Sequence, residues 1–196
     1  FDEYQLGGRF GGPIIKDKLF FFASAEMKNR NQSPDAGLIG EEVTNEFPVS
    51  KETIQRIKDI FITKYNYNPG GYGSYTSYTK DVKLFLRLDY NLNDENRLTI
   101  RHNFVNGSRS SGVSRSASSF TFDGSEYLYR SMQNQTVLQL NTLYSNLFAN
   151  EARLAFTAIS DKRDIQGSPF PSVSLYPTSG SGKVYAGIDN YSQANT

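Results

Sequence analysis

The segment that most constrains the fold of this chain is 81–91, where apolar and polar residues alternate nearly without error. Its apolar set is Val82, Leu84, Leu86, Leu88 and Tyr90, and the other set is Lys83, Phe85, Arg87, Asp89 and Asn91. Because successive side chains of a β-strand point to opposite faces, period two indicates a strand whose faces meet different surroundings. The chain is therefore expected to build a sheet with one apolar face.

Similar alternation elsewhere predicts roughly six strands, arranged as three hairpins. The other strand segments are 2–11, 19–30, 97–106, 138–144 and 151–158. A turn rich in Asn and Asp separates 81–91 from 97–106, and a connection of similar size separates the last two segments. Short polar connections of this kind join antiparallel neighbours. The sequence therefore predicts an all-β, antiparallel fold.

The connections between these segments alternate between short and long. Those within hairpins cover about 12–18, 91–96 and 145–150, and those between hairpins cover about 31–79, 106–132 and 162–196. All long connections then fall on one side of the sheet. This asymmetry is typical of outer-membrane barrels, which have short periplasmic turns and long extracellular loops. The long connections are polar, and the Ser-rich stretch 108–119 is expected to be a flexible loop.

One helix of about three to four turns is expected inside the first long connection. Ser50 is a suitable N-cap residue. The apolar residues that follow at helical spacing are Ile54, Ile57, Ile60 and Phe61. Asn66, Asn68 and the Pro-Gly-Gly segment 69–71 then end the pattern.

The composition disfavours several classes of protein. Lys and Arg number 21 against 20 Asp and Glu, so the cationic field that nucleic-acid binding requires is missing and no nucleic-acid partner is expected. No apolar run is long enough for a membrane-spanning helix or a signal peptide, and the chain reads as a piece of a longer protein. A mean hydropathy of −0.54 still suits a barrel, because only alternate residues face lipid.

Motifs for catalysis or cofactor binding are missing from the sequence. The chain has no Cys and a single His, His102, so neither a metal site nor a Cys/His pair is supported. Residues 180–183, Gly-Ser-Gly-Lys, resemble the end of a phosphate loop. However, Pro177 stands at the first Gly position, and no strand-loop-helix frame surrounds them. We therefore expect no enzyme, no metal site and no cofactor.

Alternation alone does not separate a membrane barrel from a soluble β-sandwich, because both have one apolar face per strand. The asymmetry of the connections favours the barrel. Predicted strands of about ten to twelve residues do so too, since soluble strands usually have about five or six. In a barrel, the lipid-facing residues would be Val82, Leu84, Leu86, Leu88, Leu98, Ile100, Leu138, Leu140, Leu154 and Phe156.

Three tyrosines in the first long connection are candidates for ligand binding. Tyr72, Tyr75 and Tyr78 recur at every third position among Gly and Ser residues. Aromatic side chains in such loops can form adaptable binding surfaces. The alternative role is loop packing, because a long polar loop needs some apolar contacts to hold a shape.

The segment 6–22, Leu-Gly-Gly-Arg-Phe-Gly-Gly-Pro-Ile-Ile-Lys-Asp-Lys-Leu-Phe-Phe-Phe, resembles the part just after the plug in Oar-like TonB-dependent receptors of Gram-negative bacteria. Further similarities follow in the expected order. They are 67–73 (Tyr-Asn-Pro-Gly-Gly-Tyr-Gly), 87–94 (Arg-Leu-Asp-Tyr-Asn-Leu-Asn-Asp) and 170–173 (Phe-Pro-Ser-Val). The resemblance therefore spans nearly the whole chain.

This resemblance implies that residues 1–196 form about six strands of a roughly 22-stranded outer-membrane barrel, with the plug and the remaining strands outside the segment. The implied function is binding and import of a nutrient, energised by the TonB complex through the plug. Implied partners are outer-membrane lipid, an extracellular substrate and a surface lipoprotein or another protein. Two alternatives stay open: a binding, adhesion or protein-export factor on the same barrel, and a soluble β-sandwich that binds carbohydrate.

Overall fold

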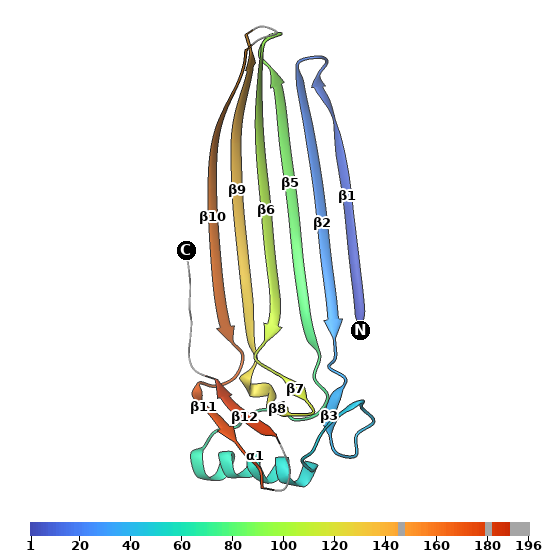
Figure 1. The fold of residues 1–196 in the computed structure, drawn as a ribbon, viewed down its shortest axis with the longest axis vertical. Helices are drawn as coiled ribbons and strands as arrows, with labels where there is room; N and C mark the ends of the chain where they lie inside the picture. The colour runs from blue at the N-terminus through green and yellow to red at the C-terminus, as the bar shows by residue number, and fades with distance from the viewer. Residues whose placement is uncertain (145–147, 179–181, 189–196) are drawn as a thin grey trace.

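The computed structural model of the chain describes residues 1–144, 148–178 and 182–188, and most of it is antiparallel β-structure (Figure 1). Six long strands form one sheet in the order β1-β2-β5-β6-β9-β10. Their bounds are β1 (Asp2–Ile15), β2 (Leu19–Gln32), β5 (Ser77–Asn91), β6 (Asn96–Ser111), β9 (Tyr127–Leu143) and β10 (Ala149–Ile165). The sheet does not close on itself, so β1 and β10 are its two edges.

The six predicted strands are all present, and they extend beyond the segments that the sequence pattern indicated. They contain 14 to 17 residues, whereas strands in globular proteins usually have about 3–10. The largest difference is in β9, which begins at Tyr127 rather than at 138. Apart from Met132, residues 130–136 carry polar side chains on both faces, so alternation of polarity does not reveal this part of the strand.

The turn between β1 and β2 is shorter than predicted. The expected turn at 12–18 is wrong in its first part, because β1 continues through Pro13 to Ile15 and only 16–18 reverse the chain. Pro13 has no N–H to donate, which is tolerated here because β1 is an edge strand with a register shift at this point. Asp17 makes the reversal with a φ of 60°, a left-handed conformation in which Asp is enriched.

At the opposite end of the sheet, the three long connections pack into one small unit, which we call the cap (Figure 1). The cap comprises residues 33–76, 112–126, 166–178 and 182–188. Its elements are β3 (Ala36–Leu38), β4 (Asn45–Phe47), α1 (Lys51–Tyr65), β7 (Arg115–Ser116), β8 (Ser119–Thr121), the short helix η1 (Asp123–Ser125), β11 (Phe170–Leu175) and β12 (Lys183–Ile188). The predicted placement of all long connections at one end is confirmed.

The prediction of a flexible loop at 108–119 is wrong. Residues 108–111 extend β6, β7 forms inside the remainder, and β8 begins at residue 119. These two strands belong to a four-stranded sheet with the order β11-β12-β8-β7. In that sheet β12 pairs with β8 in parallel, although the two strands are far apart in the sequence. A local pattern of Ser residues carries no signal for such a pairing.

The cap holds the apolar core of the described part of the chain. Phe120 is enclosed, with its ring centroid 5.8 Å from those of Phe47 and Phe122. Tyr67 and Phe170 stack with their centroids 4.1 Å apart, which joins the first long connection to the third. The buried apolar residues are Leu38, Phe47, Val49, Ile54, Phe61, Tyr67, Phe120, Phe122, Val184 and Ala186, and none of them lies in the six long strands.

The predicted helix is confirmed as α1, with 15 residues or about four turns. Ser50 Oγ accepts a hydrogen bond from Thr53 N at 3.3 Å, as an N-cap does. Asn66 ends the helix with a left-handed φ of 51°. Ile54 and Phe61 are buried in the cap core. Among the residues described, no helix combines the length and apolar character needed to cross a membrane.

A close backbone contact between two glycines holds parts of the cap together. Gly124 N donates to Pro69 O at 2.8 Å, so η1 lies against the Pro-Gly-Gly segment of the first long connection. Gly70 has a φ of 98°, and a Cβ there would clash with the Gly124 backbone. A Cβ at Gly124 would in turn clash with Pro69. Glycine is therefore required on both sides of this contact.

Candidate functional site on the two faces of the long sheet

The registers of the long strands sort their side chains onto two faces. On the apolar face lie the even-numbered residues of β1, β5, β6, β9 and β10, in β1 as far as Gly12, together with the odd-numbered residues of β2. The charged face carries the remaining residues of these strands. All ten predicted lipid-facing residues lie together on the apolar face. In one row across four strands, the paired residues are Leu88, Ile100, Leu138 and Leu154.

The apolar face is open in this chain. Eight of the ten residues are exposed, from 39% at Leu138 to 70% at Leu154, and Leu98 and Leu140 are half-buried. In the described part of the chain, neither a helix nor a second sheet lies across the long strands (Figure 1). Between the rows of Tyr90 and Val82, no Asp, Glu, Lys or Arg occurs on this face in any of the six strands.

Measured along the strands, this uncharged band is about as long as the apolar band of an outer-membrane barrel is tall. From Tyr90 to Val82 the chain takes eight residue steps, which is about 27 Å along the strand before any tilt. The apolar band of an outer-membrane barrel is about 25 Å tall. Charged side chains on this face begin only beyond the band, toward the cap. They are Asp2, Lys80, Arg130, Lys162 and Asp164.

One polar pair lies in the middle of the apolar face. His102 is opposite Leu86 on one side and opposite Thr136 on the other. The Nδ1 atom of His102 is 2.9 Å from Thr136 Oγ1. A polar group removed from water costs free energy unless it is hydrogen-bonded, and this contact meets that need. The pair is therefore a hydrogen-bonded contact within a largely apolar surface, whose other polar residues in the band, Asn106, Asn134 and Ser160, lie nearer the cap.

The charged face carries ion pairs and hydrogen bonds that connect neighbouring strands. Asp89 accepts a hydrogen bond from Arg87 at 2.7 Å and one from Thr99 at 2.8 Å. Nearer the cap, Lys83 and Glu26 form an ion pair of 2.8 Å across β5 and β2. Exposed ion pairs contribute little to stability. Their number here indicates a face that is built to meet water.

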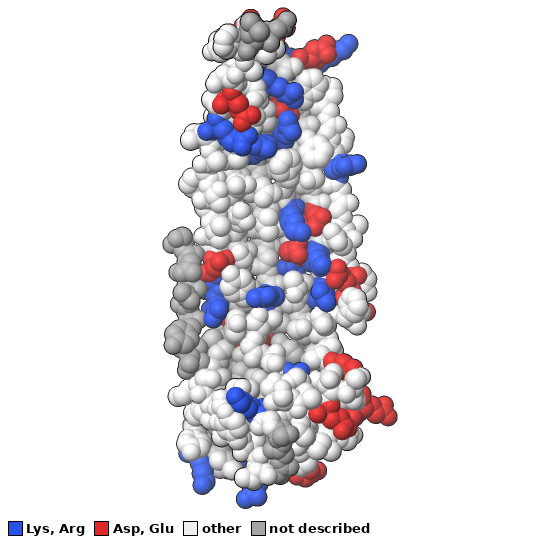
Figure 2. Space-filling view, viewed as in Figure 1, with Lys and Arg blue, Asp and Glu red and all other residues white. Residues whose placement is uncertain are grey.

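The charged face also has an excess of positive charge. Its positions in the six long strands hold ten Lys or Arg and six Asp or Glu, whereas the whole chain has a net charge of only +1. Figure 2 shows charged side chains spread over the long strands on one side of the molecule. An excess of fixed cations raises the local concentration of anions.

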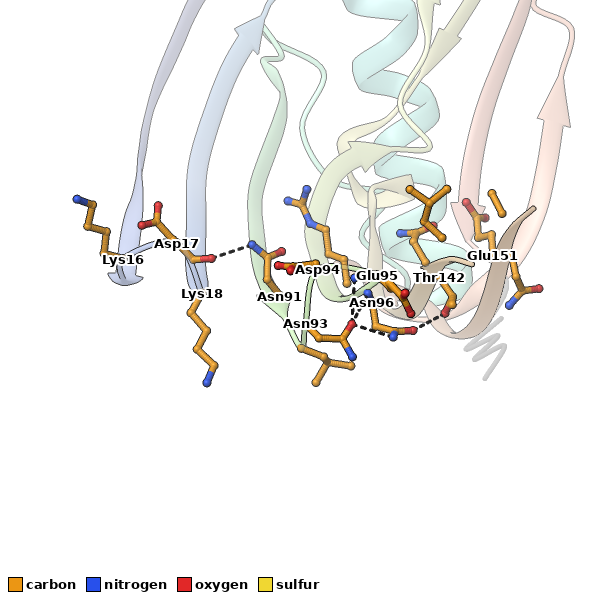
Figure 3. Close-up of a pocket in the computed structure, with 16 residues that line it drawn as sticks. Lys16, Asp17, Lys18, Asn91, Asn93, Asp94, Glu95, Asn96, Thr142 and Glu151 are labelled. Carbon is orange, nitrogen blue, oxygen red and sulfur yellow. Dashed lines mark hydrogen bonds between the residues drawn. The ribbon is translucent and has the colours of Figure 1, made fainter. Parts of the chain in front are cut away.

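A wide polar concavity of about 920 Å³ lies at the short-turn end of the sheet (Figure 3). Many of its polar side chains hold the turns in place. Asn93 Oδ1 accepts from the backbone N–H groups of Asn96 at 2.7 Å and Glu95 at 3.1 Å. Asn91 Nδ2 donates to the carbonyl of Asp17 at 3.0 Å, which connects two neighbouring turns. These lining side chains therefore form a network that stabilises the turns.

The three tyrosines proposed for ligand binding lie in three different settings. Tyr72 donates a hydrogen bond to Gln55 of α1 at 2.6 Å. Tyr75 donates to Glu126 at 3.2 Å, next to η1. Tyr78 belongs to β5, on the apolar face near the cap. The contacts of Tyr72 and Tyr75 are those expected of loop packing, and ligand binding by the three tyrosines stays a prediction.

A buried ion pair in the cap was not apparent from the sequence. The Arg115 side chain is only 3% exposed and donates to Asp123 and to the carbonyl of Gly73. Burial raises the pKa of Asp123, although the attraction of Arg115 opposes this shift. Burial also raises the pKa of Glu126. The pair fixes β7 to η1 and to the first long connection, and nothing in the surrounding Ser residues marks it.

Across the described ranges, no group of three or more His, Asp or Glu side chains is placed to hold a metal ion. No family model, curated protein or solved structure matches the chain. The features from which a function can be inferred are therefore the two faces of the long sheet, the cap and the resemblance of segment 6–22.

Proposed function

We propose that this chain is part of a β-barrel in the outer membrane of a Gram-negative bacterium, within a receptor that binds and imports a nutrient. The receptor is of the TonB-dependent kind that segment 6–22 resembles. Lipid contacts the apolar face, and the plug, which couples to the TonB complex, lies on the side of the charged face. Substrate and any surface lipoprotein meet the cap.

The observation that carries this proposal is a single-layered sheet whose apolar face contains an uncharged band and whose other face is cationic and ion-paired. Exposing apolar surface to water costs roughly 25 cal/mol per Å². Soluble proteins rarely expose apolar patches of more than a few hundred Å². A bilayer supplies the missing contact for one face, and a wet lumen suits the other. Further strands would pair the open edges β1 and β10.

The placement of the connections gives the proposed orientation. The short turns lie in the periplasm and the cap lies outside the cell, because outer-membrane barrels carry their longer connections on the extracellular side. β1 then runs toward the periplasm and β2 runs back. Substrate would first meet a packed cap with its own core rather than a set of loose loops.

The same barrel could serve an adhesion or protein-export factor, and one observation favours this second candidate. Ile60 of α1 is 41% exposed and lines an apolar groove of the cap together with the exposed Tyr65 and Tyr176, where a protein partner could bind. A soluble β-sandwich is disfavoured, because the four-stranded sheet lies in the cap and not across the apolar face (Figure 1).

The test places single cysteines at Leu86 and Arg87, adjacent residues of β5 that point to opposite faces. The full-length protein is studied in isolated outer membranes. Leu86→Cys should react poorly with a water-soluble maleimide, and a fluorophore attached there should be quenched by a nitroxide dissolved in the lipid. Arg87→Cys should react readily and should escape that quencher.

Leu92→Cys is the matched control, because Leu92 lies in the short turn that follows β5. It should be labelled from water. If Leu86→Cys and Leu92→Cys are labelled equally and neither is quenched from the lipid phase, the apolar face is not in the membrane and the proposal fails.

A further inference from the structure

A cavity of about 510 Å³ lies where the charged face meets the cap. Its walls come from the start of β9, the end of β10 and the cap strands β8, β11 and β12. Arg163 is the one charged residue among the described residues that line it, and most of the others carry hydroxyl groups. The cavity therefore combines one fixed cation with many hydroxyls.

Arg163 is held in a way that leaves its N–H groups available. Its guanidinium lies over the Tyr127 ring, 5.2 Å from the centroid, in a cation–π contact. Within the described part of the chain, it forms no ion pair, and Asp161 on the same face of β10 does not pair with it. Arg109 stacks in the same way on Tyr129, at 5.5 Å. A guanidinium in this state can bind a carboxylate or sulfate in two-pronged geometry.

The hydroxyl groups of the cavity provide a second kind of contact. Ser125 Oγ already donates to the carbonyl of Gly187 at 3.0 Å. The side-chain hydroxyls of Ser114, Ser172 and Tyr185 form no hydrogen bond within the described residues. Because a hydroxyl both donates and accepts, such a set matches the hydroxyls of a sugar ring, which have the same property.

We infer that this cavity binds an acidic sugar, whose carboxylate or sulfate pairs with Arg163 while its hydroxyls bind Ser114, Ser172 and Tyr185. The volume lies within the usual range for small-molecule sites, about 300–1,000 Å³. The positive excess on the charged face draws anions toward the same place. The inference rests on the proposed function, because import is the reason for which the protein would bind such a ligand. It adds the class of substrate that is imported.

The test uses isothermal titration calorimetry on the full-length protein in detergent. The acidic probes are digalacturonate and galactose 6-sulfate, and their neutral counterparts are galactobiose and galactose. At least one acidic probe should bind about tenfold more tightly than its counterpart, because only an acidic sugar can pair with Arg163. Arg163→Gln should weaken acidic binding about tenfold and leave neutral binding unchanged.

Arg130→Gln is the matched control, because Arg130 lies on the opposite face of β9, paired with Asp164 at 2.9 Å. It should change neither affinity. Equal binding of acidic and neutral probes, no binding of either acidic probe, or no effect of Arg163→Gln would each overturn the inference. Cell fractionation separates the two proposals. If the protein binds acidic sugar through Arg163 but is found outside the outer membrane, only the membrane placement is refuted. If it is found in the outer membrane but binds no acidic sugar, only the acidic-sugar site is refuted.

Discussion

The cap and the long sheet satisfy their apolar side chains in opposite ways. In the cap, Phe120, Phe122 and Ile54 are at most 1% exposed, inside a core that the three long connections build together. In the sheet, Leu154 and Phe156 are 70% and 68% exposed on a face that no described element covers. The cap therefore supplies its own apolar environment, whereas the sheet requires one from outside the chain.

This difference means that the two regions should respond to different surroundings. A deletion in the cap core acts through lost packing, which is present in water, detergent and membrane alike. A substitution on the apolar face acts through transfer of the side chain into whatever medium lies against it. Matched pairs of substitutions can therefore test whether the contrast is real.

The largest effect is expected from Phe120→Ala in the cap. Phe120 is 1% exposed and packs against Phe47 and Phe122. Removing a buried Phe ring costs about 3–5 kcal/mol through lost contacts and the cavity left behind. Native-state hydrogen exchange of the full-length protein should show lower protection in β8 and β12 and unchanged protection in β5 and β6.

The control for this prediction is Phe148→Ala, because Phe148 is 69% exposed at the short-turn end. Its effect on the cap should be within about 0.5 kcal/mol. If Phe120→Ala lowered protection in the long strands as much as in the cap, the two regions would unfold as one unit and the contrast between them would be lost.

A somewhat smaller effect is expected from Leu86→Arg on the apolar face. Leu86 is 53% exposed in the middle of the uncharged band. An Arg near the bilayer midplane costs about 2–4 kcal/mol, which reversible urea unfolding of the full-length protein in lipid vesicles would measure. Leu92→Arg makes the same chemical change in the short turn, where Leu92 is 45% exposed, and should be nearly neutral. A cost at Leu86 as small as that at Leu92 would show that Leu86 does not lie in hydrocarbon.

Sequence alone could predict the long sheet because its information is local. The alternation at 81–91 sets both the strand and the face of each residue. Register follows largely from the same pattern, since a slip of one residue would move Leu88 to the charged face, away from Ile100 and Leu138. Where both faces are polar, as at the start of β9, that information is missing, and the predicted start at 138 is wrong.

The cap and the acidic-sugar site depend on contacts that no local pattern records. β8 pairs with β12, which lies in the third long connection. Arg115 pairs with Asp123 because η1 places the carboxylate next to it. Arg163 fell within a predicted polar connection, so neither its place in β10 nor its stacking on Tyr127 could be anticipated. Long-range pairing, rather than propensity, decides these features.

The smallest expected effect separates the cap from the sheet by pH and concerns Glu126→Gln. Burial raises the pKa of Glu126 above its ordinary value of 4.5. As pH rises, the unfolded state therefore releases this proton before the folded cap does, and the cap loses stability from about pH 4.5 until the folded pKa is passed. Gln never ionises, and its amide oxygen can still accept the hydrogen bond from Tyr75.

The advantage of Glu126→Gln should thus be near zero at about pH 4 and should grow toward about pH 7. It should stay at about 0.5 kcal/mol or less, because the carboxylate is partly exposed and solvent screens its charge. Hydrogen exchange of the cap amides, corrected for the intrinsic effect of pH, would measure it. Glu42→Gln, at an exposed residue of the first long connection, should give a flat difference. At about pH 4 the wild-type carboxyl is largely protonated in the folded and the unfolded state. If Glu126→Gln raised stability as much at about pH 4 as at about pH 7, the buried charge would therefore not be the cause of the increase.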